Sequence, residues 1–263
     1  MITFVKAHAY GNDFLYVDRD GVGDRSPALL ARELCDRHCG IGADGLILYA
    51  PSVDGASMSL WNADGSAAEV SGNGVRGLAA LLLRGVEPLE AGVTIRTDAG
   101  IRRFTRTGRP SKTRQIFRGE MGQPAGIRTA SITAGGETLS AVVLSVGNPQ
   151  CVVLGPLPGD ERFGRLGAAL EHHAMFPGGT NVEFAQVETP VRVRIRIWER
   201  GCGPTQSSGT GSCAALVAAA SFGGAARSAE VIAPGGAQHV EWIDDHLYLT
   251  GWAEIVAEGR WLR

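Results

Sequence analysis

The chain has 263 residues, of which 44% are hydrophobic and 20% charged, and its net charge is −2. This composition is typical of a globular protein, and the small net charge gives no reason to expect nucleic acid or an anionic membrane as a partner. No apolar run is long enough to span a membrane, and the first residues lack the pattern of a signal peptide, so we expect a cytoplasmic protein. The odd count of five cysteines agrees with a reducing compartment.

The first half of the chain is predicted to form short strands and one helix, with a glycine-rich turn between the fourth and fifth strands. A helix over 26–35 would have Ser26 as its N-cap and Pro27 at its first helical position. Apolar or alternating runs predict the strands, at 4–7, 14–17, 45–50, 57–62, 93–97 and 101–105.

The second half repeats this order of elements. A helix is predicted over 164–171, and a strand–turn–strand run over 240–256 ends the chain. The other strands are predicted at 141–146, 151–154, 181–185 and 191–198. The repetition favours a duplicated fold.

One glycine-rich turn in each half leads directly into a helix of small apolar residues. The first turn is Ser71–Gly74 and the second is Ser207–Gly211. The first N–H groups of each helix have no internal partner and lie at the positive end of the helix dipole. Two such N-termini suit a bound carboxylate, with Ser71 and Ser208 on opposite faces of one carbon. In the alternative interpretation, both serines are only helix N-caps.

Two other patterns favour ordinary structural roles. Cys35 and Cys39 lack a second ligand pair at zinc spacing, so we expect buried small side chains and no metal site. Residues 101–119 carry seven basic residues and no acidic one. Because no aromatic platform accompanies them, the solvated face of a hairpin is favoured over an anion-binding patch.

Eight motifs, in family order from end to end, resemble those of diaminopimelate epimerases, which epimerise an amino acid without a cofactor. They include the turn around Gly11, the Gly-Asn-Pro of 147–149 and the Trp-Glu-Arg-Gly of 198–201. The full set lies at 6–14, 35–45, 62–66, 72–76, 147–149, 179–182, 198–201 and 209–211.

The resemblance implies an α/β fold of two pseudo-symmetric halves, each a mixed sheet around a central helix. We place the halves at 1–120 and 121–263, with the tail near 252–263 able to pack back on the first half. The implied activity is conversion of LL-diaminopimelate to meso-diaminopimelate, a precursor of lysine and peptidoglycan, by two-base proton transfer. The resemblance implies a PLP-independent isomerase with no cofactor and no metal, a small amino acid as substrate, and a homodimer as one possible assembly.

The chain departs from the family at three positions. The family places a catalytic cysteine immediately before the glycine of each turn, where this chain has Ser71 and Ser208, and a histidine where it has Gln150. A hydroxyl is a far weaker acid than a thiol and needs a neighbouring base. Three explanations stay open: an engineered inactive enzyme, epimerisation with hydroxyls, or another reaction such as isomerisation or dehydration. A catalytically silent binding protein is a further alternative.

The resemblance also implies a set of site residues. Glu199, with Ser71 and Ser208, belongs to the catalytic group, and Glu199 and Arg200 would bind the distal amino-acid group of the substrate. Asparagine amides would bind the zwitterion, and backbone N–H groups of the turns would bind the reacting carboxylate. These residues are Asn12, Asn62, Asn73, Asn148 and Asn181 for the amides, and Gly72, Asn73, Gly209 and Thr210 for the turns.

Overall fold

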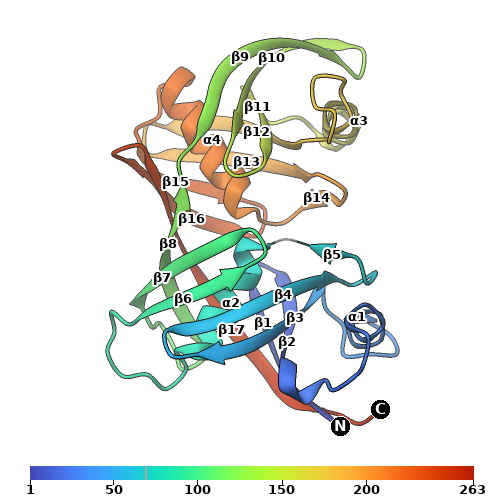
Figure 1. The fold of residues 1–263 in the computed structure, drawn as a ribbon. Helices are drawn as coiled ribbons and strands as arrows, with labels where there is room; N and C mark the ends of the chain where they lie inside the picture. Colours follow the sequence, from blue (N-terminus) through green and yellow to red (C-terminus); the bar gives the residue numbers. More distant parts are fainter. Residues whose placement is uncertain (69) are drawn as a thin grey trace. The chain divides into compact units, whose positions relative to one another are not determined.

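The computed structural model describes residues 1–68 and 70–263 and shows two compact units (Figure 1). Unit 1 comprises Met1–Gly119 and Gly251–Arg263, and unit 2 comprises Glu120–Thr250. Two strands, β8 (Arg114–Gly122) and β17 (His246–Trp261), run through these boundaries and therefore contribute residues to both units.

Unit 1 is a mixed sheet around the helix α2 (Gly72–Leu82). Neighbouring strands follow the order β17–β1–β2–β3–β4–β6–β7–β8, with β2/β3 and β4/β6 parallel and the other pairs antiparallel. A short strand, β5 (Ala67–Ala68), pairs with β4. The remaining bounds are β1 Ile2–Ala9, β2 Asn12–Asp18, β3 Gly45–Ser52, β4 Gly55–Asn62, β6 Gly92–Thr97 and β7 Gly100–Gly108.

Unit 2 has the same strand pattern around the helix α4 (Gly209–Phe222). Its order is β9–β10–β11–β12–β13–β15–β16–β17, and here β11/β12 and β13/β15 are the parallel pairs. This match confirms the predicted fold class of two similar halves. The strand bounds are β9 Ala125–Ala134, β10 Glu137–Ser145, β11 Pro149–Leu154, β12 Asn181–Thr189, β13 Arg192–Glu199, β14 Gly203–Thr205, β15 Ser228–Ala233 and β16 Gly236–Ile243.

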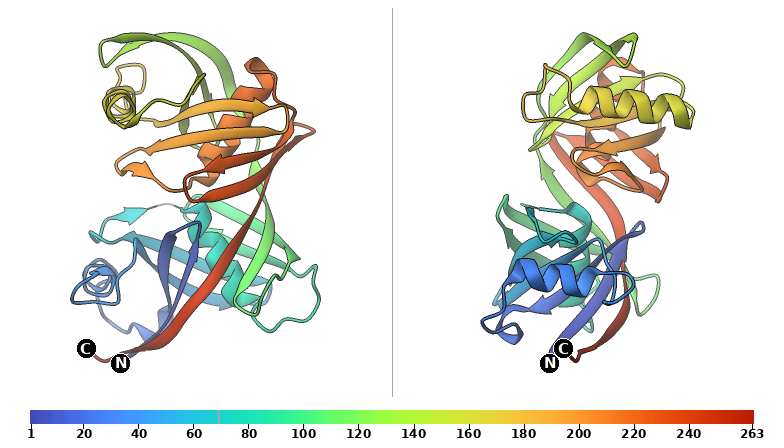
Figure 2. Two further views of the ribbon diagram at one scale, coloured as in Figure 1. Left: turned by 180° about the vertical axis from the view of Figure 1, so that it is seen from behind. Right: turned by 90° about the vertical axis from the view of Figure 1, so that its right-hand side faces the viewer.

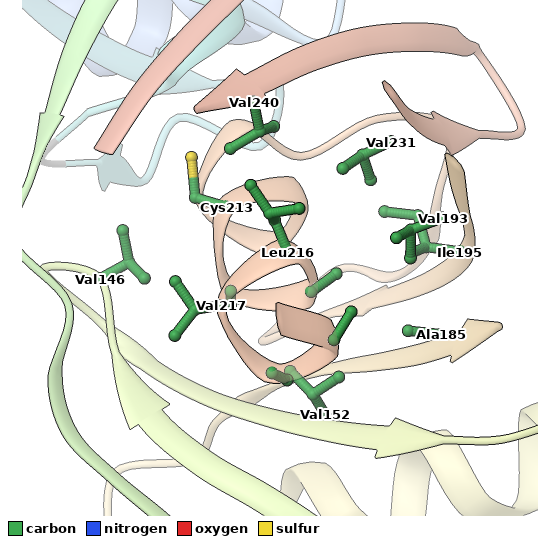
Figure 3. Packing of buried hydrophobic residues seen from close by; sticks show 14 of the residues in the cluster. Val146, Val152, Ala185, Val193, Ile195, Cys213, Leu216, Val217, Val231 and Val240 are labelled. Carbon is green, nitrogen blue, oxygen red and sulfur yellow. The ribbon is translucent and has the colours of Figure 1, made fainter. Parts of the chain in front are cut away.

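The central helix of each unit is buried because most of its side chains are small or apolar, although α2 also buries Asn73 and Arg76. Every residue of α4 over 211–219 is buried. Figure 3 shows Leu216 and Val217 among side chains from the surrounding strands, including Val152 and Val193. The corresponding cluster in unit 1 includes Val75 and other side chains of α2. Both helices are therefore held rigidly from all sides, which fixes the position of their N-termini.

A second helix lies outside the strands of each unit (Figure 2). In unit 1, α1 (Pro27–Cys35) packs Leu30 and Leu34 on β2 and β3. In unit 2, α3 (Asp160–Glu171) packs Leu166 and Leu170 in the equivalent way. Ser26 stands at the N-cap of α1 as predicted, although its side chain makes no capping bond.

The structure corrects two expectations from the sequence. Cys39 is exposed, whereas Cys35 is buried as expected. The solvated-face interpretation of 101–119 is wrong for Arg106, which is fully buried. Its guanidinium binds Gln115 and the carbonyl groups of Leu83, Val86, Pro88 and Leu89. This arginine therefore satisfies backbone acceptors at and beyond the C-terminus of α2.

Among the described residues, no helix combines the length and apolar character that crossing a bilayer requires.

Candidate active site

Ser71 and Ser208 occupy the same local geometry at the start of the two central helices. Both have extended backbone angles, and both hydroxyl oxygens accept a hydrogen bond from the helix, from Gly74 N at 3.2 Å and from Gly211 N at 3.1 Å. Both serines are thus true N-caps. A hydroxyl that accepts one bond still has its own proton to donate, so the cap leaves each serine able to take part in proton transfer.

The third residue of each helix is a glycine because the helix touches the strand beneath it. A Cβ on Gly74 would lie 2.8 Å from Cδ1 of Ile47, and one on Gly211 would lie 2.5 Å from Oε1 of Glu183. Both distances are too short for real contacts. By contrast, a Cβ on Gly72 would meet nothing within 4 Å, which leaves that backbone open to a ligand.

In unit 1 the structure brings Asn12 and Asn73 together. The Asn73 amide donates to Oδ1 of Asn12 at 3.4 Å and accepts from Arg76 at 3.1 Å. Asn12 in turn donates to Oδ2 of Asp44 at 2.8 Å. Asn73 is 4% exposed and Arg76 is 1% exposed, so a buried cation orients the amide from behind.

An ionic network holds the segment that carries Asn12. Asp13 binds Lys6 at 2.9 Å and Arg37 at 2.8 Å, and Arg37 also binds Asp44 at 2.8 Å. Burial raises the pKa of Asp13, but the bonds from Arg37 and Lys6 outweigh this and lower it overall. Sequence reasoning did not assign these residues a role, although all lie within the motifs at 6–14 and 35–45.

Asn62 lies at the exposed end of β4 and donates to Oγ of Ser66 at 3.0 Å. The next residue, Ala63, donates its N–H to the carbonyl oxygen of Asp44 at 3.1 Å. The end of β4 is therefore tied to the segment that orients Asn12, although Asn62 binds a different partner.

In unit 2 the described contacts join four of the expected residues through Gln150. Arg200 donates its backbone N–H to Oδ1 of Asn181 at 2.9 Å, which fixes the orientation of that amide. The Asn181 NH2 group then faces the Gln150 amide at 3.2 Å, a contact that is a hydrogen bond when the oxygen of Gln150 points toward Asn181. In this orientation Thr210 Oγ1 lies 3.2 Å from the same oxygen, and the Asn148 amide, 2.7 Å away, bonds to it only by turning its own NH2 group toward Gln150.

Glu199 lies beside the hydroxyl of Ser208. Burial raises the pKa of Glu199, and the nearby Ser208 hydroxyl opposes this rise only in part. A carboxylate with a raised pKa is a stronger base than an ordinary one, and here it faces a hydroxyl. The side chain of Arg200 is exposed and binds the carbonyl oxygen of Gly178 at 3.2 Å.

Two buried glutamates were missed by sequence reasoning. Glu171, at the end of α3, accepts from Gly201 N at 2.7 Å and from Trp198 Nε1 at 2.7 Å, and so holds the turn after Glu199. Glu183 is fully buried on β12, directly beneath Gly211. A charged residue inside the apolar run 181–185 was the signal that could have revealed Glu183.

The family model for diaminopimelate epimerase matches residues 4–125 and 142–256. The chain belongs to the diaminopimelate epimerase family. A curated diaminopimelate epimerase from Desulforudis audaxviator is 39% identical over 286 aligned positions, which cover 100% of both chains. Further curated relatives that are 37% identical and cover 98% of this chain are also named diaminopimelate epimerases, so the chain is an isomerase-type enzyme.

Solved structures of more distant proteins share the fold. A predicted epimerase from Pseudomonas aeruginosa superposes with a TM-score of 0.77 at 15% identity, covering 100% of both chains. A probable proline racemase from Agrobacterium radiobacter gives a TM-score of 0.74 at 17% identity, covering 100% of this chain and 93% of the racemase. At these identities the likeness shows the fold alone.

Proposed function

We propose that this protein converts LL-diaminopimelate to meso-diaminopimelate by moving the proton on one α-carbon, without PLP or a metal. The observation that carries the proposal is the family match over almost the whole chain, together with a capped helix N-terminus at the same place in each unit. The product is a precursor of lysine and peptidoglycan, which places the enzyme in amino-acid biosynthesis.

In this proposal the two serines act on opposite faces of the α-carbon. Ser208 Oγ takes the α-proton while its own hydroxyl proton passes to Glu199, and Ser71 delivers its hydroxyl proton to the other face. Ser71 then regains a proton from water, and Glu199 loses its proton to water. The carbanion-like charge is spread into the substrate carboxylate, which the N–H groups of the two helix N-termini stabilise. The place of Glu199 beside the Ser208 hydroxyl, and the raised pKa of Glu199, support this assignment of the base.

The remaining predicted site residues bind the substrate in this proposal. Glu199 and Arg200 bind its distal amino-acid group, and Gly72, Asn73, Gly209 and Thr210 bind the reacting carboxylate. The contacts between Asn12 and Asn73, and between Asn181 and the Arg200 backbone, support a preformed set of amides in each unit. The amides that bind the zwitterion are Asn12, Asn62, Asn73, Asn148 and Asn181.

Proton exchange with solvent tests the proposal directly. The protein is incubated with LL-diaminopimelate in deuterium oxide, and the α-proton signal is followed by NMR. We expect the signal to decline as deuterium enters the α-position and meso-diaminopimelate to appear. Binding of diaminopimelate without any exchange over days would contradict the catalytic part of the proposal.

A catalytically silent binding protein is the second candidate. The observation in its favour is that both hydroxyl oxygens are engaged as helix caps, a role that requires no chemistry. Calorimetric binding of diaminopimelate with no deuterium incorporation would favour this candidate. Exchange on another amino acid or a hydroxy acid, with no binding of diaminopimelate, would instead favour a divergent isomerase or dehydratase.

We further infer a cytoplasmic location from the composition and the odd cysteine count, and a homodimer by likeness to the family. Sedimentation of the purified protein tests the assembly. A single species of 27.6 kDa at all concentrations would contradict the dimer.

A further inference from the structure

A carboxyl group is enclosed beneath the N-terminus of α4, outside the set of groups that the proposed reaction uses. Glu183 is 0% exposed, and its Oε1 atom lies where a Cβ on Gly211 would come within 2.5 Å. The equivalent position under α2 is Ile47, which touches Gly74. The second unit has therefore placed a carboxyl group where the first has an alkyl side chain.

Glu183 is the acceptor at the end of a chain of amides. Once the Arg200 N–H fixes Asn181, the oxygen of Gln150 faces Asn181 and its NH2 group faces Glu183. That NH2 group lies 3.0 and 3.2 Å from the two carboxyl oxygens. Gln150 is itself 0% exposed, so a buried amide donor has its acceptor in Glu183.

The electrostatic surroundings of Glu183 favour its neutral form. Burial, and then repulsion by Glu199 on β13, raise its pKa well above the usual range. The charge of Glu183 also acts on the Cys151 thiol on β11, whose pKa is raised to about 12, chiefly by burial. The first turn of α4 carries no acidic residue.

We propose that Glu183 is a positioning residue which, through the amide of Gln150, holds Asn181 and the backbone of Arg200 in the geometry that binds substrate. The substrate part of this inference rests on the proposed function, whereas the amide chain itself does not. Because burial raises the pKa of Glu183 well above the usual range, Glu199 is the carboxyl group that we assign to Ser208. Ionisation of Glu183 at high pH would add a second negative charge next to Glu199 and weaken binding of an anionic group.

Two substitutions at Glu183 and one at the matched position of unit 1 test the inference. Glu183→Gln keeps an acceptor for Gln150, Glu183→Leu removes it, and Ile47→Val is the control for a change beneath the other helix. We expect Glu183→Leu to raise Kd and KM for diaminopimelate about ten- to hundredfold, with a smaller effect on kcat, because a buried donor loses its partner. Glu183→Gln and Ile47→Val should stay within about threefold of the wild type.

Side-chain amide signals in nitrogen-15 NMR spectra provide a readout that needs no substrate. The Gln150 and Asn181 signals should move together in the wild type as the pH is raised, and should stay in place in Glu183→Gln. They should be displaced in Glu183→Leu and unchanged in Ile47→Val.

The outcomes separate the two proposals. If the wild type neither binds nor exchanges diaminopimelate, the proposed function fails, and the amide signals still decide the role of Glu183. If Glu183→Leu leaves the Asn181 signal or the KM unchanged, the positioning role is wrong. If that variant does not fold, the pH titration of the wild type against Glu183→Gln tests the role instead, and signals that do not respond to pH overturn the inference.

Discussion

The first turns of α2 and α4 have the same backbone and the same serine cap, yet they lie on different side chains. Beneath α2, Gly74 packs on the apolar groups of Ile47 and Phe14. The strand registers place Glu183 and Gln150 at the matching positions beneath α4. The difference teaches that the duplicated backbone provides two similar serine-capped helix N-termini, whereas the side chains of the strands beneath them decide which one has acid–base groups within reach.

A second matched pair extends this asymmetry to the serines. Glu199 ends β13 and lies beside Ser208, whereas the residue that ends β4 is Asn62, which binds Ser66. An amide cannot accept a proton from a serine hydroxyl, but a carboxylate can. Ser208 is therefore better equipped than Ser71 to act as a base.

The largest expected effect comes from removing the base of unit 2. Glu199→Gln should lower the rate of α-deuterium incorporation by about 10²- to 10⁴-fold, which is the usual contribution of a positioned general base. The same NMR assay measures it, and Asn62→Asp is the matched variant in unit 1. If Glu199→Gln and Asn62→Asp lowered the rate of deuterium incorporation equally, Ser208 and Ser71 would not differ in their access to a base.

Restoring thiols sharpens the same comparison. Ser71→Cys with Ser208→Cys should raise proton exchange by about ten- to hundredfold, because a thiol at a helix N-terminus reaches its anionic form far more readily than a hydroxyl. The N–H groups and the asparagines are unchanged, so the calorimetric Kd should shift by less than about threefold. Adding Gln150→His then tests whether Gln150 limits the gain. A double variant that binds more tightly without exchanging faster would show that the serines are ligand contacts only.

Replacing the glycine at the third position of each central helix, Gly211 or Gly74, with alanine should have a smaller effect, and this effect is on stability. Gly211→Ala should lower the free energy of unfolding by about 1–3 kcal/mol, since the new Cβ would be forced against the enclosed carboxyl of Glu183. Gly74→Ala should cost less, because its nearest neighbour is the terminal methyl of Ile47 at 2.8 Å. Urea denaturation of both variants measures the difference, and the reverse order would contradict it.

The smallest effect is a difference in how stability depends on pH. The folded chain keeps a proton on Glu183 above the pKa of the unfolded state, about 4.3, so the folded state binds more protons there. Stability from this group is complete below that pH and is lost as the pH rises toward the raised pKa, with a slope of up to about 1.4 kcal/mol per pH unit. Denaturation curves of Glu183→Gln should lack this component, whereas Ile47→Val should retain it.

The elements of this fold could be predicted where local chemistry decides them. Pro27 and the alternating run 57–62 predicted a helix and a strand that the structure shows. The hydroxyls before Gly72 and Gly209 marked the starts of both central helices for the same reason, since an N-cap is a property of a few consecutive residues.

The features that the sequence did not predict depend on contacts between parts of the chain that are distant in sequence. Arg106 is buried because the end of α2 presents carbonyl groups to it, which a local charge count cannot reveal. Gly74 and Gly211 make way for a strand beneath each helix, a contact that the local sequence does not reveal. The partners of Glu183 come from β11, β13 and α4, so its role emerged only from the packed structure.

The pairing of β1 with the end of β17 makes unit 1 depend on two segments that are distant in sequence. Ile2 lies opposite Trp261, so this part of the sheet forms only when the two segments meet. Unit 1 needs both Met1–Gly119 and Gly251–Arg263 to complete its sheet, whereas residues 120–250 of unit 2 form one continuous segment, so we expect the sheet of unit 1 to be completed later in folding. Since both termini lie on neighbouring strands, a circular permutant that joins them and opens the chain elsewhere would give unit 1 a continuous segment and remove that delay.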